Sequence, residues 1–117
     1  DAGRIIAALR QIAARSRAAG LRVFGGTLLP FKDASLEDFY TPQGEETRQA
    51  VNLWIRTGNA FDGVIDFDSI MQSPSDPMML NPAFDSGDHL HPNDRGYQVM
   101  GNSIDLNLFS RPRESAP

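Results

Sequence analysis

Cysteine is absent from the 117 residues of this sequence. Its absence excludes disulfide bonds, zinc sites built on thiolates and a cysteine nucleophile. Long apolar runs are absent as well, since no stretch approaches the roughly 20 residues that a membrane-spanning helix needs. No signal peptide is recognisable at the start. These features predict no membrane span and leave the compartment open.

Basic residues are in the minority, with 11 Lys and Arg against 15 Asp and Glu and a formal net charge of -4. Because nucleic-acid binding requires a basic surface, this balance argues against a nucleic-acid partner. The arginines near the N-terminus are an exception, and we expect them to form a solvated helix face. They are Arg4, Arg10, Arg15, Arg17 and Arg22.

The first half of the chain predicts a helix, a strand and a second helix. Residues 2–19 have apolar side chains at three- and four-residue spacing, and Gly20 is expected to end this helix in a left-handed turn. Residues 21–29 predict a buried strand. Residues 41–57 predict a helix with Thr41 as the N-cap, followed by proline. Its core-facing residues are expected to be Ala50, Val51, Leu53 and Trp54.

The second half predicts a strand, a long loop and a last helix. The expected bounds are residues 61–67 for the strand, 68–72 for a short helical turn, 73–91 for the loop and 93–109 for the last helix, on which Tyr97 is expected to pack. Residues 110–117 predict a disordered tail, so the domain is expected to span residues 1–109.

The order helix, strand, helix, strand, helix is typical of an α/β fold with a parallel sheet and helices on its faces. Two strands are too few for such a sheet, because both would have an exposed edge and an isolated pair is marginal in water. We therefore expect residues 1–109 to be part of a larger fold whose other strands precede residue 1. A fragment that oligomerises to cover its strand edges is the alternative.

The chemistry-bearing segment lies at the end of the long loop, where His91 directly precedes the start of the last helix. The positive partial charge of a helix N-terminus favours a neutral ring, as a general base requires. Asp88, three residues upstream, is close enough in a turn to accept the Nδ1 proton, leaving Nε2 to face a nucleophile. Asp-x-x-His alone is a weak signal, because the aspartate can merely cap a turn.

The same loop has two other interpretations. A metal could bind His89 and His91 together with Asp85, Asp88 and Asp94, but no third strong ligand has the usual spacing and the helix dipole repels cations, so we predict no metal site. His89 is otherwise a loop side chain near the substrate or in solvent. Residues 78–80, Met-Met-Leu, are either an apolar lip beside the site or a buried anchor.

The continuation of the motif resembles a known family. Residues 88–97, Asp-His-Leu-His-Pro-Asn-Asp-Arg-Gly-Tyr, resemble the last motif block of SGNH (GDSL-type) hydrolases, in which Asp-x-x-His is followed by Pro and a helix. Residues 21–30 are similar to the penultimate parallel strand of that family, which ends in Thr-x-x-Pro. Residues 46–56 and 61–67 resemble the following helix and the last strand. The likeness is closest to secreted arylesterase-like or acetylesterase-like members.

The resemblance implies a three-layer parallel-sheet fold of the flavodoxin-like type, with this chain as its C-terminal portion. It implies a serine esterase or acylhydrolase in which Asp88 and His91 complete a Ser-His-Asp triad and no cofactor is needed. The implied substrate is an ester, either an acetylated carbohydrate or an aryl ester. A secreted or periplasmic location is also implied by the family.

Three motif blocks of the family are missing: Gly-Asp-Ser with the nucleophile, and the Gly and Gly-x-Asn-Asp blocks that build the oxyanion hole. Ser86 is too close to Asp88 in sequence to serve as the nucleophile and is expected to be a loop residue. The expected partner is therefore the N-terminal half of the same domain, and this chain alone is predicted to be inactive. The alternative is a catalytically inert truncated α/β fragment that acts as a structural or interaction module.

Overall fold

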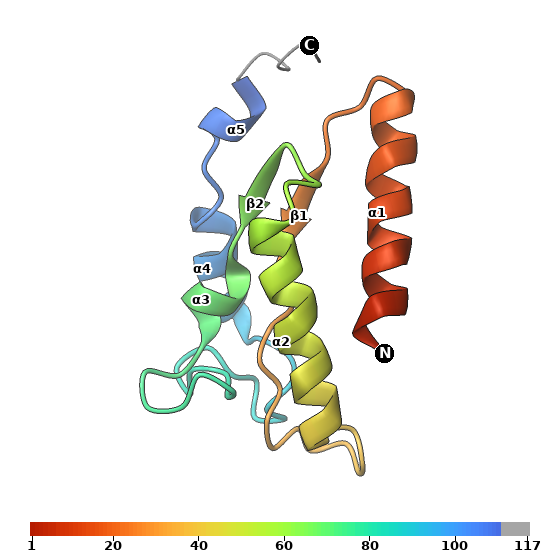
Figure 1. Cartoon of the computed structure of the whole chain (residues 1–117). Helices are drawn as coiled ribbons and strands as arrows, with labels where there is room; N and C mark the ends of the chain where they lie inside the picture. Colours follow the sequence, from red (N-terminus) through yellow and green to blue (C-terminus); the bar gives the residue numbers. More distant parts are fainter. Residues whose placement is uncertain (111–117) are drawn as a thin grey trace.

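The computed structural model describes residues 1–110, which form helices on both sides of a small parallel sheet (Figure 1). The helices are α1 (Ala2–Ala18), α2 (Pro42–Thr57), α3 (Phe67–Met71), α4 (Asp94–Asn102) and α5 (Asn107–Ser110). The strands are β1 (Phe24–Gly26) and β2 (Gly63–Ile65), paired in parallel. Helices α1 and α2 pack together on one side, and α3 packs against α4 on the other.

Two residues predicted at helix ends, Thr41 and Gly20, take up the expected roles. Thr41 accepts a hydrogen bond from the backbone N–H of Gly44 at 2.9 Å, and α2 then begins with proline and ends at Thr57. Gly20 has a φ of 81° just after α1, as expected for a left-handed turn. Both helices were therefore predicted nearly to the residue, because a cap is a local interaction.

The strands are shorter than predicted, with a ladder of three residues in each. Side chains accept hydrogen bonds from backbone N–H groups just beyond both ends of β1. Asp62 accepts from the backbone N–H of Val23 at 2.8 Å, and Asn52 accepts from that of Leu28 at 2.7 Å. Gly25 leaves room for the ring of Phe61, which would lie 2.5 Å from an added Cβ. A side chain at position 25 would therefore collide with this ring.

The core-facing side of α2 differs from the prediction. Leu53 is 60% exposed and Ala50 is also exposed, whereas Val51 is buried as predicted. The other buried residues of α2 are Glu45, Arg48, Asn52 and Ile55. The apolar pattern misled the prediction because the buried side of the helix is mainly polar, and its hydrogen bonds go to the segment after β1 and to α3.

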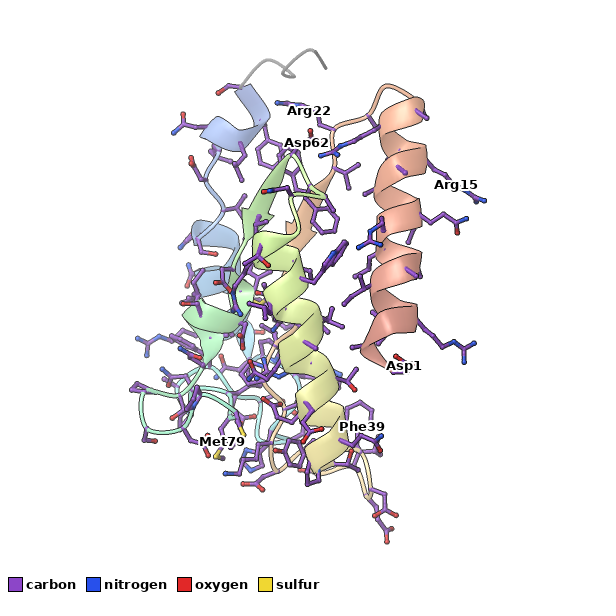
Figure 2. The ribbon with its side chains drawn as sticks, in the orientation of Figure 1. Asp1, Arg15, Arg22, Phe39, Asp62 and Met79 are labelled. Carbon is purple, nitrogen blue, oxygen red and sulfur yellow. The ribbon has the colours of Figure 1, made fainter. Side chains whose placement is uncertain are left out.

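Trp54 is partly buried and lies between the two longest helices and the start of β2. The guanidinium of Arg10 on α1 lies 5.6 Å from the centre of its ring, and Phe61 meets it edge-on at 5.7 Å. Arg17 also leaves the expected solvated face, since it approaches Asp62 at 3.5 Å. Arg15 does point outward from α1 as predicted (Figure 2).

The sequence predicted one continuous last helix, but the helix breaks after Asn102. The Ser103 hydroxyl donates to the carbonyl of Met100 at 2.6 Å, and Asp105 accepts from the backbone N–H of Asn107 at 2.9 Å. Such short polar side chains compete with helical hydrogen bonds, which explains the break. Tyr97 is 55% exposed, so within residues 1–110 it is not the packing residue that was expected on this helix.

The remaining predictions concern the ends and the surface. Ser110 closes α5, and the rest of the predicted tail lies outside the described residues. Within residues 1–110, no helix is both long enough and apolar enough to cross a membrane. Several large apolar side chains are exposed, among them Ile12, Leu21, Leu53 and Leu106.

Candidate active site

The loop of residues 85–93, here called the Asp-His loop, closes on itself before α4 begins. Asp85 and Pro92 form an antiparallel bridge, and the backbone N–H of Ser86 donates to the carbonyl of His91 at 3.0 Å. Asn93 accepts from the backbone N–H of Gly96 and donates from its amide to the carbonyl of Asp85. One residue thus both caps α4 and holds the base of the loop.

Asp88 and His91 lie together as the sequence predicts. The Nδ1 atom of His91 is 2.6 Å from one carboxylate oxygen of Asp88. The other oxygen accepts from the backbone N–H groups of Leu90 and His91 and from the hydroxyl of Ser86. Ser86 is therefore a loop residue that supports the carboxylate, as expected.

These hydrogen bonds change the acidity of Asp88. The backbone N–H of His91, the side chain of His91 and the backbone N–H of Leu90 hold the pKa of the Asp88 carboxyl well below its usual range. The carboxyl is therefore ionised at neutral pH and can accept a hydrogen bond from Nδ1–H of His91. This arrangement orients the ring and leaves Nε2 for another group.

The ring of His91 is accessible, with 65% of its side chain exposed, compared with 40% for Asp88. Among residues 1–110, no group occupies its Nε2 atom. A hydroxyl could therefore approach this nitrogen from solvent. The pair can take up a proton from such a hydroxyl and stabilise the resulting imidazolium, which is general-base chemistry.

A second aspartate–histidine pair lies in the same loop, and the sequence analysis did not identify it. The Nδ1 atom of His89 is 2.5 Å from a carboxylate oxygen of Asp85, whose side chain is only 7% exposed. Its only sequence signal is the four-residue spacing. Each histidine thus pairs with its own aspartate, and the described part of the chain holds no group of three residues suited to a metal ion.

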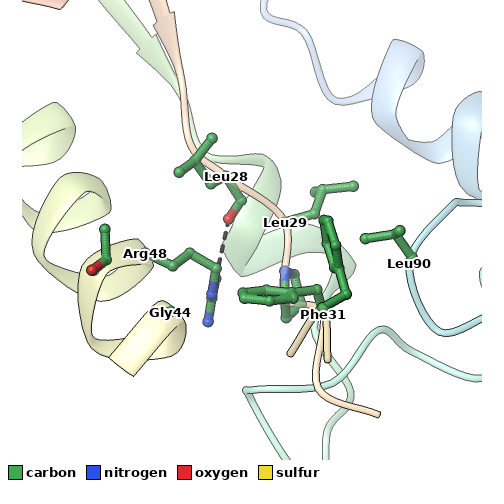
Figure 3. A pocket seen from close by; sticks show the side chains of 9 residues that line it. Leu28, Leu29, Phe31, Gly44, Arg48 and Leu90 are labelled. Atoms are coloured by element: carbon green, nitrogen blue, oxygen red, sulfur yellow. Dashed lines mark hydrogen bonds between the residues drawn. The ribbon is translucent and has the colours of Figure 1, made fainter. Parts of the chain in front are cut away.

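An open cavity of about 430 Å³ lies next to this loop, between the end of β1 and α2 (Figure 3). Its lining is mostly apolar and consists of Leu28, Leu29, Pro30, Phe31, Phe39, Gly44, Thr47, Arg48 and Leu90. Leu90 connects the cavity to the Asp-His loop, because it directly precedes His91. Ser35 strengthens this connection by donating from its backbone N–H to the carbonyl of Asp88 at 2.8 Å.

Residues 78–80 do not line this cavity. Leu80 is 2% exposed and pairs with Gln72, which makes it a buried anchor. Met78 is half-buried, and its sulfur accepts the hydroxyl of Tyr40 at 3.9 Å. Of the two interpretations of this segment, the buried anchor applies to Leu80.

A group of charged side chains, here called the buried ion cluster, lies between α2 and α3 at the far side of the cavity. Arg48 donates two hydrogen bonds to Glu45, at 2.8 and 2.6 Å, and approaches Asp68 at 2.5 Å. Arg56 connects Asp68 to Asp66, with both contacts at 2.7 Å. The three central side chains are at most 7% exposed. Only the i,i+3 spacing of Glu45 and Arg48 hinted at it in the sequence.

The family model and the solved structures that resemble this chain agree with each other. A family model described as GDSL-like Lipase/Acylhydrolase matches residues 2–104. A GDSL-like lipase from Bacteroides thetaiotaomicron is similar with a TM-score of 0.78 and 18% sequence identity, over 94% of this chain and 53% of that chain. A protein from Bacteroides fragilis, assigned to the acylhydrolases, gives a TM-score of 0.72 and 25% identity, over 94% and 52%. No curated protein sequence matches the chain significantly.

This chain contains only part of the fold of the proteins that it resembles. The chain spans about half the length of the solved structures that it matches. The expected fold class is confirmed, because the two-stranded parallel sheet and its helices correspond to part of a larger α/β fold. The exposed apolar side chains and the free strand edges are consistent with that correspondence.

Proposed function

Since this chain belongs to the GDSL-like lipase/acylhydrolase family, we propose that it supplies the acid and base residues of a carboxylic-ester hydrolase. Asp88 and His91 are two members of a Ser-His-Asp triad in this proposal. The observation that supports it is the 2.6 Å contact between Nδ1 of His91 and Asp88, combined with the exposure of the ring. The serine comes from an N-terminal half of the same domain, which is the partner of this chain.

The proposed mechanism is acyl transfer in two steps. The serine hydroxyl attacks the ester carbonyl while Nε2 of His91 takes its proton, and His91 then returns the proton to the leaving alcohol. Water attacks the acyl-enzyme by the same route. Asp88 holds the tautomer and stabilises the imidazolium in both steps, consistent with its lowered pKa. Donors to the oxyanion also belong to the N-terminal half.

The cavity narrows the choice of substrate. Its lining includes two phenyl rings, those of Phe31 and Phe39, and the side chain of Leu90, which belongs to the Asp-His loop. Such a lining suits an aryl ester better than an acetylated carbohydrate, because sugar hydroxyls would need polar partners there. We therefore propose an aryl or other apolar ester as the substrate class.

The decisive experiment measures hydrolysis of p-nitrophenyl acetate by this chain joined to its N-terminal half. We expect His91→Ala to lower kcat by about 10⁴-fold or more, as removal of a triad base does elsewhere. Gln98→Ala, on the exposed surface of α4, is the control and should leave kcat unchanged.

The chain alone should hydrolyse nothing measurable, because each missing oxyanion donor is worth roughly 10²–10³ in turnover. Unchanged turnover in His91→Ala would reject the proposal and favour the alternative of an inert structural or interaction module. Turnover by the isolated chain that depends on His91 would reject the need for an N-terminal half.

A further inference from the structure

His89 adopts a backbone conformation that is uncommon for its residue type. Its φ of 58° lies in the left-handed region, which residues other than glycine enter rarely and with strain. The residue stands directly between Asp88 and Leu90, in the middle of the turn that brings His91 back to Asp88. A strained residue at this place indicates that other contacts hold it there.

Asp85 makes those contacts. One carboxylate oxygen accepts from the backbone N–H groups of Gly87 at 2.8 Å and of His89 at 3.0 Å. The other lies 2.5 Å from Nδ1 of the His89 ring. The Asp85 side chain is only 7% exposed, so this acceptor is fixed in place. The carboxylate therefore holds both the backbone and the ring of His89.

The left-handed turn has a direct consequence for His91. Asp88 accepts from the backbone N–H of Leu90 at 2.9 Å and of His91 at 2.8 Å, which requires the chain to reverse at residue 89. The same reversal brings Nδ1 of His91 to the second oxygen of Asp88. Ser35 meanwhile fixes the carbonyl of Asp88 from outside the loop.

We propose that Asp85 and His89 are a positioning pair that holds the turn in which His91 meets Asp88. The effect on hydrolysis rests on the proposed function, whereas the effect on the geometry of His91 does not. His89 acts through His91 in this proposal and is a positioning residue. It does not touch the substrate.

Three variants of His89 separate the two features that the pair supplies. Asn tolerates the left-handed conformation and can donate from its amide to Asp85. Gly tolerates the conformation but has no donor. Val provides no donor, and its branched side chain strongly disfavours a positive φ. The experiment uses this chain joined to its N-terminal half and measures kcat, KM and the downfield NMR signal of the His91 Nδ1 proton.

We expect His89→Asn to retain the His91 proton signal and to keep kcat within about threefold of the unchanged protein. His89→Gly should broaden the signal and lower kcat about tenfold, and His89→Val should abolish the signal and lower kcat about 100-fold, as expected for a misplacement near 1 Å. KM should change less than threefold in all three, because the substrate contacts are intact. If His89→Val does not fold, His89→Gly decides the test.

Two results would overturn the positioning role. One is an unchanged His91 signal and kcat in His89→Gly and His89→Val. The other is a raised KM in all three variants with the signal retained, because His89 would then contact the substrate. Failure of the proposed function looks different: His91→Ala would retain full turnover, while the NMR series would still report whether His89 holds the turn.

Discussion

The buried ion cluster and the Asp-His loop are both built from carboxylates that bind cationic or N–H groups. They differ in whether a hydrogen-bonding group stays unused and exposed to water. In the cluster, Arg48 is 3% exposed, and its donors are directed to Glu45, Asp68 and the carbonyl of Leu28. In the loop, Asp88 is also fully engaged, but within residues 1–110 the Nε2 atom of His91 has no partner and most of the ring is exposed to water.

The comparison shows how similar residue types serve different purposes. Buried charges are tolerated when every partner is present, and removal of one partner leaves the other uncompensated. The cluster therefore joins α2 to α3 and supports the end of β1. The loop places its charge at the surface, where a hydrogen-bonded carboxylate orients a ring that can still exchange protons. Unused hydrogen-bonding capacity distinguishes the candidate site from the structural network.

The largest expected difference between the two regions is in turnover. Asp88→Asn, in this chain joined to its N-terminal half, should lower kcat about 10⁴-fold, because the amide no longer selects the correct tautomer of His91. The matched variant Asp68→Asn changes a carboxylate of the cluster and should leave kcat within about tenfold while it reduces stability. Equal losses of kcat in both variants would erase the functional distinction between the regions. Ester-hydrolysis kinetics and urea unfolding provide the two measurements.

The second difference is in stability. Arg48→Met should lower the free energy of unfolding by about 3–5 kcal/mol, because Glu45 would remain buried without its arginine and Asp68 would lose one of its two arginines. Arg4→Met, on the exposed surface of α1, is the control and should stay within about 0.5 kcal/mol. Urea unfolding monitored by circular dichroism measures both. A loss as small in Arg48→Met as in the control would mean that the cluster contributes nothing to the fold.

The smallest expected effect is on acid stability. Hydrogen bonds from Arg56 lower the pKa of Asp66, and those from the backbone and ring of His91 lower the pKa of Asp88. A carboxyl whose pKa is lowered in the folded state stabilises the fold at pH values above its ordinary pKa of 3.8. This stabilisation is lost as the pH falls from 3.8 toward the lowered pKa. Unfolding by urea at pH 6 and pH 3 should show a smaller acid loss in Asp66→Asn and Asp88→Asn than in the unchanged protein. An unchanged acid loss in Asp88→Asn would show that this carboxyl is not stabilised by folding.

The accuracy of the sequence predictions depended on the distance over which each interaction acts. The N-cap of α2 at Thr41 and the contact between Asp88 and His91 were both predicted, because each joins residues at most three apart. The catalytic role of the latter pair stays a prediction. The buried face of α2 was not predicted, because it depends on Asp68 and Leu28, which lie 20 residues away from Arg48.

The sequence by itself determined the starts of α1, α2 and α4, the α/β order and the turn that joins Asp88 to His91, because these follow from local hydrogen bonds and apolar spacing. Only the tertiary structure decided that a buried Asp85 pairs with His89, that the last helix breaks after Asn102 and that polar residues form the buried side of α2. These features depend on which backbone groups need partners once distant segments meet. Local patterns do not contain that information.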